Sequence, residues 1–169
     1  RAMGVRRLDA MVISHADNDH SGGAAGLFAA LPVDDALGAE GIEGLSSRSC
    51  ERGMRWEWDG VAFAVLHPRA GLPGSDNNRS CVLRIAAAGR VLLLAGDIEA
   101  EAEALLLASA RQQLRADILL VPHHGSHSSS TPAFVAAVQP RSARVSAGHR
   151  NRFGHPHPAV LARSRASGA

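Results

Sequence analysis

Imidazole and carboxylate side chains gather at the points where apolar segments of this chain end. The apolar segment 8–14 is followed at once by the polar stretch 15–20. Later segments are followed by Asp97, by the histidine pair at 123–124 and by the histidines within 149–157. Loops at strand ends are where α/β folds build their sites, so we expect these four groups to converge. Burying so much charge and imidazole without a cation would be costly. The pattern therefore predicts one metal site assembled from four strand ends.

Length and the alternation of elements indicate one layered α/β domain. The chain has 169 residues, of which 46% are hydrophobic and 20% charged, as is typical of a globular protein. The turns Asp59-Gly60 and Ala88-Gly89 indicate two hairpins, and Thr131-Pro132 indicates a helix start. The expected strands are 8–14, 54–58, 61–66, 80–86, 90–95, 118–121 (buried) and 144–147, and the expected helices are 22–31, 99–113, 132–139 and one after 158.

Neither hydropathy nor cysteine content indicates a membrane span or a cysteine scaffold in this chain. The longest apolar runs, 61–66 and 133–138, are far shorter than the roughly 18–20 residues that a transmembrane helix needs. The first arginines are not followed by the apolar core of a signal peptide. Cys50 and Cys81 are too few for a four-cysteine zinc site, and we expect buried thiols, with a single disulfide as the alternative.

The charge distribution indicates an anionic partner for the last third of the chain. All sixteen acidic residues precede residue 118, whereas residues 118–169 carry six arginines, six histidines and no acid. A basic segment without acids is typical of a surface that meets a polyanion. The alternative is a solvated surface that only reflects a composition biased toward arginine, since the chain contains no lysine.

Several motifs, in order along the chain, resemble those of a known superfamily. His15-Ala16-Asp17-Asn18-Asp19-His20 resembles the HxHxDH signature of the metallo-β-lactamase fold, with aspartate in place of the second histidine. The later stretches at 77–80, 96–99, 122–126 and 154–158 are similar to those of the C-terminal metallo-β-lactamase-like domain of ComEC-type DNA internalization competence proteins. The resemblance covers residues 8–162, and the motifs keep their family order, which makes it specific.

The resemblance implies a mixed α/β fold, namely a four-layer αββα sandwich with the metals at one edge of the paired sheets. Relatives begin this domain with several strands before the motif loop, whereas here the strand that leads into the motif starts near residue 8. We therefore expect an N-terminally incomplete metallo-β-lactamase-like domain over residues 1–162, followed by a frayed tail over 163–169.

The resemblance also implies two divalent metal ions. Carried over position by position, His15 and Asp17 serve one metal, and Asp19 and His20 serve the other. Asp97 occupies the place of the carboxylate that bridges the two ions. Asp97 and Asp19 are also the catalytic candidates, since Asp97 would hold the metals apart and Asp19 would orient the attacking hydroxide.

For the remaining metal ligands the motifs offer alternatives. Either His123 or His124 supplies the late histidine ligand, with His123 favoured because it is closer to the strand end. Asn78, or less favourably Asn77, stands where many relatives carry a histidine ligand. Oxygen from Asp17 and Asn78 in place of nitrogen shifts the expected metal from Zn²⁺ toward Mn²⁺ or Mg²⁺. We expect two ions, with Mn²⁺ favoured and Zn²⁺ or Mg²⁺ as alternatives.

The activity that the resemblance implies is metal-dependent DNA cleavage during transformation, by metal-activated attack of hydroxide on phosphorus. His155 or His157 is expected to protonate the leaving oxygen or to bind the scissile phosphate. Ser126 and Ser128 are expected to donate hydrogen bonds to phosphate oxygens. Arg150 and Arg152 of the same basic segment are expected to bind the flanking phosphates.

The implied partners are DNA and the rest of a parent protein. The family's parent proteins add a transmembrane channel and an oligonucleotide-binding-type domain, so we expect a soluble domain of an inner (plasma) membrane protein, with the side of the membrane left open. Two alternatives remain. One is another metallo-β-lactamase-fold hydrolase that acts on a small phosphodiester or ester, and the other is a non-catalytic DNA-binding domain.

Overall fold

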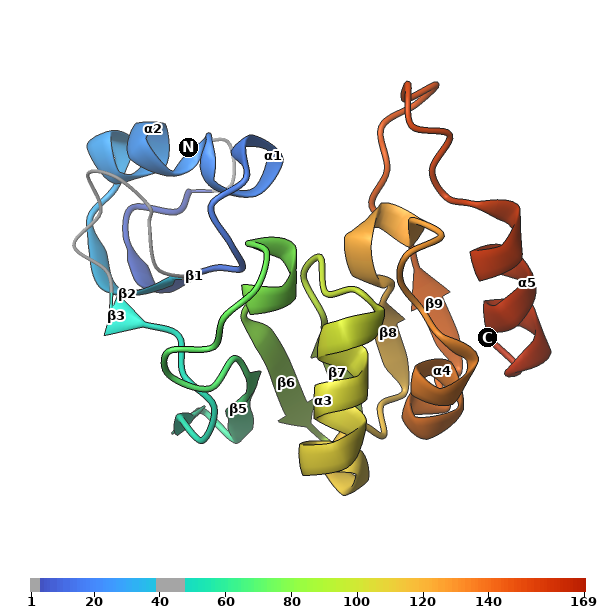
Figure 1. Ribbon diagram of the computed structural model, residues 1–169. Helices are drawn as coiled ribbons and strands as arrows, with labels where there is room; N and C mark the ends of the chain where they lie inside the picture. The colour runs from blue at the N-terminus through green and yellow to red at the C-terminus, as the bar shows by residue number, and fades with distance from the viewer. Residues whose placement is uncertain (1–3, 39–47) are drawn as a thin grey trace.

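The computed structural model describes residues 4–38 and 48–169, which form two sheets with helices on their outer sides (Figure 1). The smaller sheet has the strand order β1-β2-β3, and the larger sheet has the order β4-β5-β6-β7-β8-β9. The elements are β1 (Leu8–Ile13), α1 (Asn18–Ser21), α2 (Ala24–Ala30), β2 (Val33–Gly38), β3 (Arg48–Ser49), β4 (Arg55–Trp58), β5 (Val61–His67), η1 (Asn77–Arg79), β6 (Val82–Ala87), β7 (Arg90–Leu94), α3 (Ala100–Ala110), η2 (Arg111–Gln113), β8 (Ile118–Leu120), η3 (Pro122–Gly125), α4 (Pro132–Val138), β9 (Ser142–Arg144) and α5 (Pro158–Ala166).

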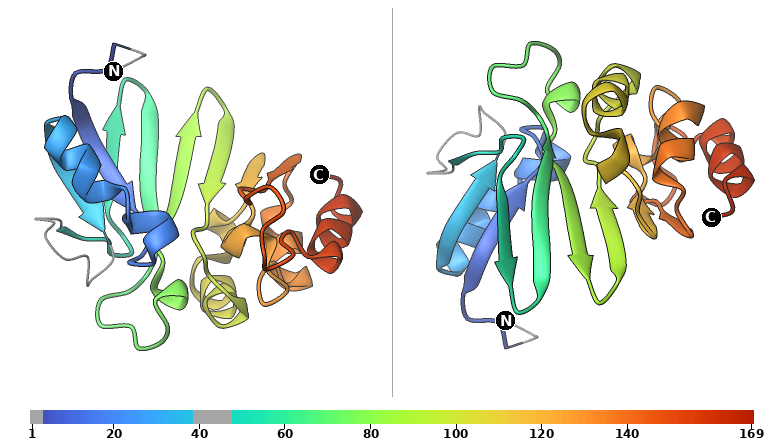
Figure 2. Two further views of the ribbon diagram at one scale, coloured as in Figure 1. Left: turned by 90° about the horizontal axis from the view of Figure 1, so that it is seen from above. Right: turned by 90° about the horizontal axis from the view of Figure 1, so that it is seen from below.

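Strand direction brings the polar strand ends together. The smaller sheet is parallel, and in the larger sheet β4 to β7 are antiparallel while β7, β8 and β9 are parallel. The carboxyl ends of β7 and β8 therefore meet at one edge, where Asp97 and the pair at 123–124 follow. Figure 2 shows the smaller sheet stacked against the β4–β6 part of the larger one, with α1 and α2 beside it.

The central strands β6 and β7 of the larger sheet are apolar on both faces because both faces are covered there. Successive residues alternate between two buried clusters: Val82 and Leu93 belong to the cluster under α3 and α4, whereas Leu83 and Leu94 belong to the cluster that includes Val12 of β1. A period of two along a strand sends neighbours to opposite faces. This arrangement gives the layer order helix, sheet, sheet, helix that the motifs imply.

Both predicted hairpins are present. β4 pairs with β5 and β6 pairs with β7 in antiparallel fashion, across Asp59-Gly60 and Ala88-Gly89. All four turn residues have positive φ, between 48° and 77°, which is the backbone of a tight type I′ turn. Thr131 caps α4 as predicted, since its side chain accepts a hydrogen bond from the backbone N–H of Phe134.

Three local predictions were wrong, the third only in part. The stretch 15–21 is not all loop, because Asn18–Ser21 forms the helical turn α1, closed by backbone bonds from His20 and Ser21 to Asp17 O. The strand expected at 144–147 lies earlier, at β9, where it pairs with β8. In the strand expected to be buried at 118–121, Leu119 and Val121 are buried as predicted, but Ile118 at its start is exposed.

The frayed tail expected from residue 163 is also wrong, because α5 continues to Ala166. Arg163 donates hydrogen bonds to the backbone oxygens of Ser129 and Ser130, and Ser164 is buried. These contacts anchor the last helix to the segment before α4. In the part of the chain that the structure describes, no helix is both long enough and apolar enough to cross a bilayer.

The cysteines form a disulfide, so the interpretation as free thiols was wrong and the alternative holds. Cys50 follows β3 of the smaller sheet, and Cys81 precedes β6 of the larger one. Both residues are buried, and the bond closes a loop with a sequence separation of 31 residues. The disulfide therefore ties the two sheets together beside the strand end that carries Ser80.

Candidate metal centre

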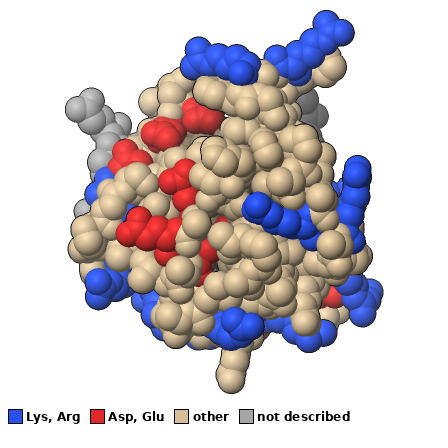
Figure 3. Space-filling view, turned by 45° about the vertical axis from the view of Figure 1, so that its right-hand side comes forward, with Lys and Arg blue, Asp and Glu red and all other residues tan. Residues whose placement is uncertain are grey.

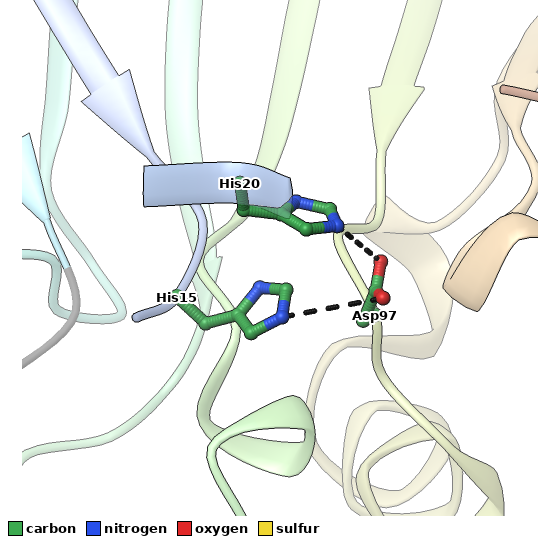
Figure 4. A group of neighbouring side chains, drawn as sticks. All are labelled: His15, His20 and Asp97. Carbon is green, nitrogen blue, oxygen red and sulfur yellow. Dashed lines mark ion pairs between the residues drawn. The ribbon is translucent and has the colours of Figure 1, made fainter. Parts of the chain in front are cut away.

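The carboxylate of Asp97 lies beside two histidines that follow β1. His20 Nε2 is 3.2 Å from Asp97 Oδ1, and His15 Nε2 is 4.0 Å from Asp97 Oδ2. Asp17 lies at the outer side, with its Oδ2 3.4 Å from His15 Nε2. Figure 4 shows both rings pointing at the carboxylate. His15, His20 and Asp97 each offer a ligand atom within 4.8 Å of the others, which is close enough to hold one ion.

A second, more open group shares His20 with the first. Asp19, His20 and His124 also offer ligand atoms within 4.8 Å of one another. His124 Nε2 is 3.1 Å from Asp19 Oδ2, 3.3 Å from Asp97 Oδ2 and 3.2 Å from His20 Nε2. Asp97 thus contacts members of both groups, which is the spatial arrangement that the motif predicts for a bridging carboxylate. Its use as a metal ligand stays a prediction.

Two serine hydroxyls face the far side of the histidine rings. Ser14 Oγ is 3.1 Å from His15 Nδ1 and 2.9 Å from His20 Nδ1. Ser80 Oγ is 3.3 Å from His15 Nδ1 and accepts the backbone N–H of Asp97 at 3.0 Å. With Nδ1 engaged, each ring presents Nε2 to the carboxylate. Neither serine was predicted as a site residue, although Ser14 directly precedes His15 and Ser80 closes the motif stretch 77–80.

Gly96 allows these groups to approach one another. It has a φ of +56°, and a Cβ at this position would lie 2.7 Å from Ser80 Cβ and 3.1 Å from Ser14 Cβ. Any other residue would push the end of β7 away from the end of β1. The short Gly96-Asp97 sequence therefore delivers the Asp97 carboxylate to the histidines because no side chain stands between the strand ends.

His124 reaches the cluster, whereas the favoured His123 does not. Both residues have left-handed backbone, with φ of 50° and 53°, so the chain turns sharply after β8 and brings the second ring round. The His123 ring lies beside Glu99 instead, with Nδ1 3.4 Å from Oε1. His123 was favoured because it is closer in sequence to the strand end, but that reasoning holds only if the chain continues in an extended conformation. Consecutive left-handed residues other than glycine are uncommon, and such strained backbone clusters at functional sites.

Asn78 points its amide elsewhere, so the expectation that it is a metal ligand was wrong. Its Oδ1 accepts the backbone N–H of Glu99 at 2.9 Å, and its Nδ2 lies 3.4 Å from Glu101 Oε2. The backbone oxygen of Asn78 meets Nε2 of the buried His67 at 2.7 Å. Asn78 therefore joins the loop before β6 to the start of α3. The first N–H groups of a helix have no partner within the helix, and the amide oxygen of Asn78 accepts one at this helix start.

Burial and neighbouring charges set the protonation of the cluster. Burial, and then repulsion from His20, lowers the pKa of His15. Burial opposes charging of His20, but the hydrogen bond and charge of Asp97 outweigh it and raise the pKa of His20. Burial likewise disfavours the Asp97 anion, yet the hydrogen bond from His20 and the adjacent rings hold the pKa of Asp97 below its usual value. An ionised carboxylate and a neutral buried imidazole are the forms that bind a cation.

An open cleft of about 450 Å³ leads to this cluster. Figure 1 shows the loop between β9 and α5 standing above the rest of the molecule, and this loop forms part of the cleft wall. Figure 3 shows acidic side chains collected in one band of the visible face, with arginines above and beside it. The lining residues are Asp17, Asp19, Asp97, His123, His124, Ser146, Ala147, Gly148, Asn151, Phe153 and His155.

The two histidines expected to act on the leaving group have different places. His155 lines the cleft, and burial, followed by repulsion from His123, lowers its pKa. His157 does not line the cleft: its Nδ1 accepts the backbone N–H of Ala159 at 3.3 Å and caps α5. Of the two alternatives, His155 or His157, the structure therefore places His155 at the cleft, whereas Nδ1 of His157 caps the helix start.

The serines expected to bind phosphate turn inward instead. Ser126 Oγ and Ser128 Oγ lie 3.0 Å apart, and Ser128 Oγ donates to Glu99 Oε1 at 2.7 Å. Glu103, which the sequence analysis did not single out, is fully buried and accepts the backbone N–H groups of Ser130 and Thr131. These bonds fold the serine segment against α3, so Ser126 and Ser128 lie outside the cleft. That prediction was wrong.

The donor set passes a test for a divalent cation. His15 Nε2 is buried and has no hydrogen-bond partner in the described ranges, although it faces carboxylates. His124 Nδ1 lies 2.7 Å from the backbone oxygen of Ser146, which only accepts, so Nδ1 carries a proton and Nε2 is the nitrogen turned toward Asp19 and Asp97. A buried imidazole nitrogen without a partner, beside several carboxylates and a second imidazole nitrogen, is a set of donors that fits a divalent cation.

Comparisons with known proteins agree with this geometry. Residues 1–149 match the family described as the metallo-beta-lactamase superfamily. The chain is 41% identical over 175 residues to competence protein ComA of Neisseria gonorrhoeae and 37% identical over 175 residues to ComE operon protein 3 of Bacillus subtilis, with 99% and 95% of this chain covered. It spans only 24% and 22% of those two proteins.

Solved structures share the fold at low sequence identity. A putative metal-dependent hydrolase from Parabacteroides distasonis has a TM-score of 0.63 at 16% identity, over 99% of this chain and 76% of that one. CmlA, a diiron β-hydroxylase from Streptomyces venezuelae, has a TM-score of 0.52 at 15% identity, over 84% of this chain and 36% of that one. With the family match over most of its length, the chain belongs to the metallo-β-lactamase superfamily.

Proposed function

We propose that this chain is the metal-dependent nuclease domain of a DNA-uptake protein and that it hydrolyses DNA phosphodiesters. One observation carries the proposal: two groups of histidine and carboxylate ligands share His20 and contact the same carboxylate, Asp97, beneath an open cleft. A cluster of this kind suits a pair of divalent ions, and the exposed Arg150 and Arg152 of the loop that forms part of the cleft wall suit a polyanion. The names of the curated relatives, which include competence proteins, support DNA as the substrate.

The residues divide into two metal-binding sets around Asp97. His15 and Asp17 would hold one ion, Asp19, His20 and His124 would hold the other, and Asp97 would contact both. Bound ions supply activation of water and stabilisation of the charge that develops on the phosphate oxygens. The set contains three carboxylates and three imidazoles. Because carboxylate oxygen suits Mn²⁺ and Mg²⁺ better than Zn²⁺, Mn²⁺ is favoured, with Zn²⁺ and Mg²⁺ as alternatives.

The chain's own side chains act on the substrate around that centre. Asp97 is almost completely buried and keeps its position through the backbone bond to Ser80, so it sets the geometry. Asp19 is exposed at the cleft and can orient a water molecule. His155 lines the same cleft and is the remaining candidate for protonating the leaving oxygen. Arg150 and Arg152 are exposed in the loop above and would hold flanking phosphates.

The parent protein and its compartment are also part of the proposal. We place the domain in an inner (plasma) membrane protein that carries a channel and an oligonucleotide-binding-type domain. The buried Cys50–Cys81 disulfide favours the outer side of that membrane, because disulfides persist in oxidising compartments and are rare in the cytosol. To test this, free thiols are alkylated on intact cells before lysis. We expect Cys50 and Cys81 to be protected by their disulfide, whereas alkylated cysteines would place the domain on the inner side.

The experiment measures cleavage of end-labelled single- and double-stranded DNA with Mn²⁺, Mg²⁺ or Zn²⁺, together with calorimetric titration of each metal. Asp19→Ala tests the cluster. Asp59→Asn is the matched control, because Asp59 is an exposed carboxylate in the β4–β5 turn, where asparagine is equally suited. We expect cleavage that needs metal, is lost in Asp19→Ala and is unchanged in Asp59→Asn.

The same experiment separates the alternatives. Metal binding without DNA cleavage, but with hydrolysis of a small phosphodiester, would indicate the other hydrolase. Metal and DNA binding without any hydrolysis would indicate the non-catalytic DNA-binding domain. Cleavage that persists in Asp19→Ala and in metal-free buffer would refute the proposed centre.

A further inference from the structure

Phe153 is the most exposed of the large apolar side chains that the structure describes. It is 66% exposed, while the next, Trp58, is 43% exposed and still contacts Phe63. Phe153 also lines the cleft that leads to Asp97 and His124. A phenyl ring left in water forgoes a substantial burial free energy, and this ring lies beside the candidate site, where its exposed face can receive a planar ligand group.

The neighbours of Phe153 are flat groups with which it stacks. The Arg152 guanidinium lies over the phenyl ring, with Cζ 4.8 Å from the ring centroid. The His155 ring is nearly parallel to it, at an interplanar angle of 18° and a centroid distance of 5.7 Å. Phe153 keeps most of its surface exposed despite both contacts, so the group still offers area for a further planar ligand.

The loop that carries Phe153 is held in shape before any ligand arrives. Asn151 Nδ2 donates to the backbone oxygens of Gly148 at 3.0 Å and of His155 at 2.7 Å, and Asn151 Oδ1 accepts the backbone N–H of His155 at 3.0 Å. One side chain therefore closes the loop around its tip. A preorganised loop loses little entropy when it binds.

The same loop is fixed to the turn that places His124. The backbone N–H of His157 donates to Gly125 O at 2.8 Å. Gly125 has a φ of +81°, and a Cβ there would lie 2.7 Å from Pro156 Cβ, so only glycine permits this contact. The aromatic platform and the candidate metal ligands thus hold a defined position relative to each other.

We propose that Phe153 and Arg152 form a base-stacking subsite for an unpaired nucleotide, whose neighbouring phosphodiester reaches the carboxylate–histidine cluster. The proposal rests on the nuclease function above and narrows its substrate to single strands and frayed ends. Inside a duplex both faces of each base are covered by neighbours, whereas an unpaired base has a free face for an aromatic side chain. The lack of any acid after residue 117 favours a phosphate-bearing ligand over other aromatic compounds.

The test compares two single strands of equal length, an oligothymidylate and a wholly abasic strand with the same phosphates. Binding is measured by fluorescence anisotropy in Ca²⁺, on the whole chain and on Phe153→Ala, Phe153→Tyr and Trp58→Ala. Trp58→Ala is the matched control because it removes another exposed aromatic, one that lies in the β4–β5 hairpin. Base stacking on an aromatic side chain corresponds to roughly a 5- to 150-fold change in affinity.

We expect the wild type to prefer the oligothymidylate and Phe153→Ala to lose about 5-fold or more on it, while its affinity for the abasic strand stays the same. Phe153→Tyr should restore the preference, and Trp58→Ala should retain it. An equal loss on both strands, or no loss on either, would overturn the subsite while leaving the nuclease proposal intact. A wild type that neither binds nor cleaves DNA, but binds metal, would overturn both.

Discussion

The floor and the rim of the cleft are built in opposite ways. The floor consists of buried or half-buried groups, His15, His20 and Asp97, each held by hydrogen bonds to serines or to one another. The rim is the loop between β9 and α5, in which Arg152 and Phe153 are exposed and no acid occurs. The floor is suited to hold cations in fixed positions, and the rim is suited to meet an anion that arrives from solvent. Binding a metal and choosing a substrate are therefore separable, and substitutions should affect one without the other.

The largest expected effect separates the two adjacent histidines after β8. His124→Ala should lower metal affinity and metal-dependent cleavage by about 100-fold or more, because it removes a side chain that contacts Asp19 and Asp97. His123→Ala is the matched control, since its ring lies beside Glu99, and we expect less than about 10-fold loss. Calorimetric metal titration and DNA cleavage check this. Equal losses in both variants would mean that the floor extends to His123.

Removal of the disulfide should destabilise the whole domain. Cys50→Ser combined with Cys81→Ser is expected to lower the free energy of unfolding by about 3–4 kcal/mol, since the bond closes a loop with a sequence separation of 31 residues. Chemical denaturation in the presence and absence of a reductant measures the change. The wild type under reductant should behave like the double variant, and a wild type insensitive to reductant would contradict the prediction.

A smaller effect is expected from the serines that orient the histidines. Ser80→Ala removes the acceptor for the backbone N–H of Asp97 and the hydroxyl beside His15 Nδ1, and should weaken metal binding by about 10- to 100-fold. DNA affinity without divalent metal should not change, because Ser80 is buried below the cleft. Ser109→Ala, at an exposed position of α3, serves as control. A loss of DNA affinity in Ser80→Ala would show that floor and rim are coupled.

The smallest effect concerns the rim. Arg150→Ala should reduce the slope of log affinity for single-stranded DNA against log salt concentration by about 0.7, the value for one phosphate contact, and leave metal affinity unchanged. Arg165→Ala, which removes an exposed arginine of α5 outside the cleft lining, should leave the slope unaltered. Equal slopes for Arg150→Ala and the wild type would remove Arg150 from the interface.

Local sequence patterns predicted most strands of the larger sheet, both hairpins and the polar stretch after β1, although β9 lies earlier than expected. Apolar alternation, two-residue turns and helix caps act between near neighbours, so they can be found without a structure. The convergence of His15, His20 and Asp97 was also predictable, because loops at strand ends are where α/β folds build their sites. That β1 and β7 lie in different, stacked sheets was not.

Which of two adjacent residues turns its side chain toward the site could not be predicted from spacing and depends on the three-dimensional fold. His124 takes the place expected of His123 because two left-handed residues turn the chain, and the amide of Asn78 binds the start of α3. The disulfide pairs residues that lie in different sheets. Ser128 turns inward because its hydroxyl donates to Glu99, and Glu103 of α3 accepts the backbone N–H groups of Ser130 and Thr131 farther along the same segment. Each outcome depends on the local backbone angle or on a partner distant in sequence, and neither is encoded in the spacing of a motif.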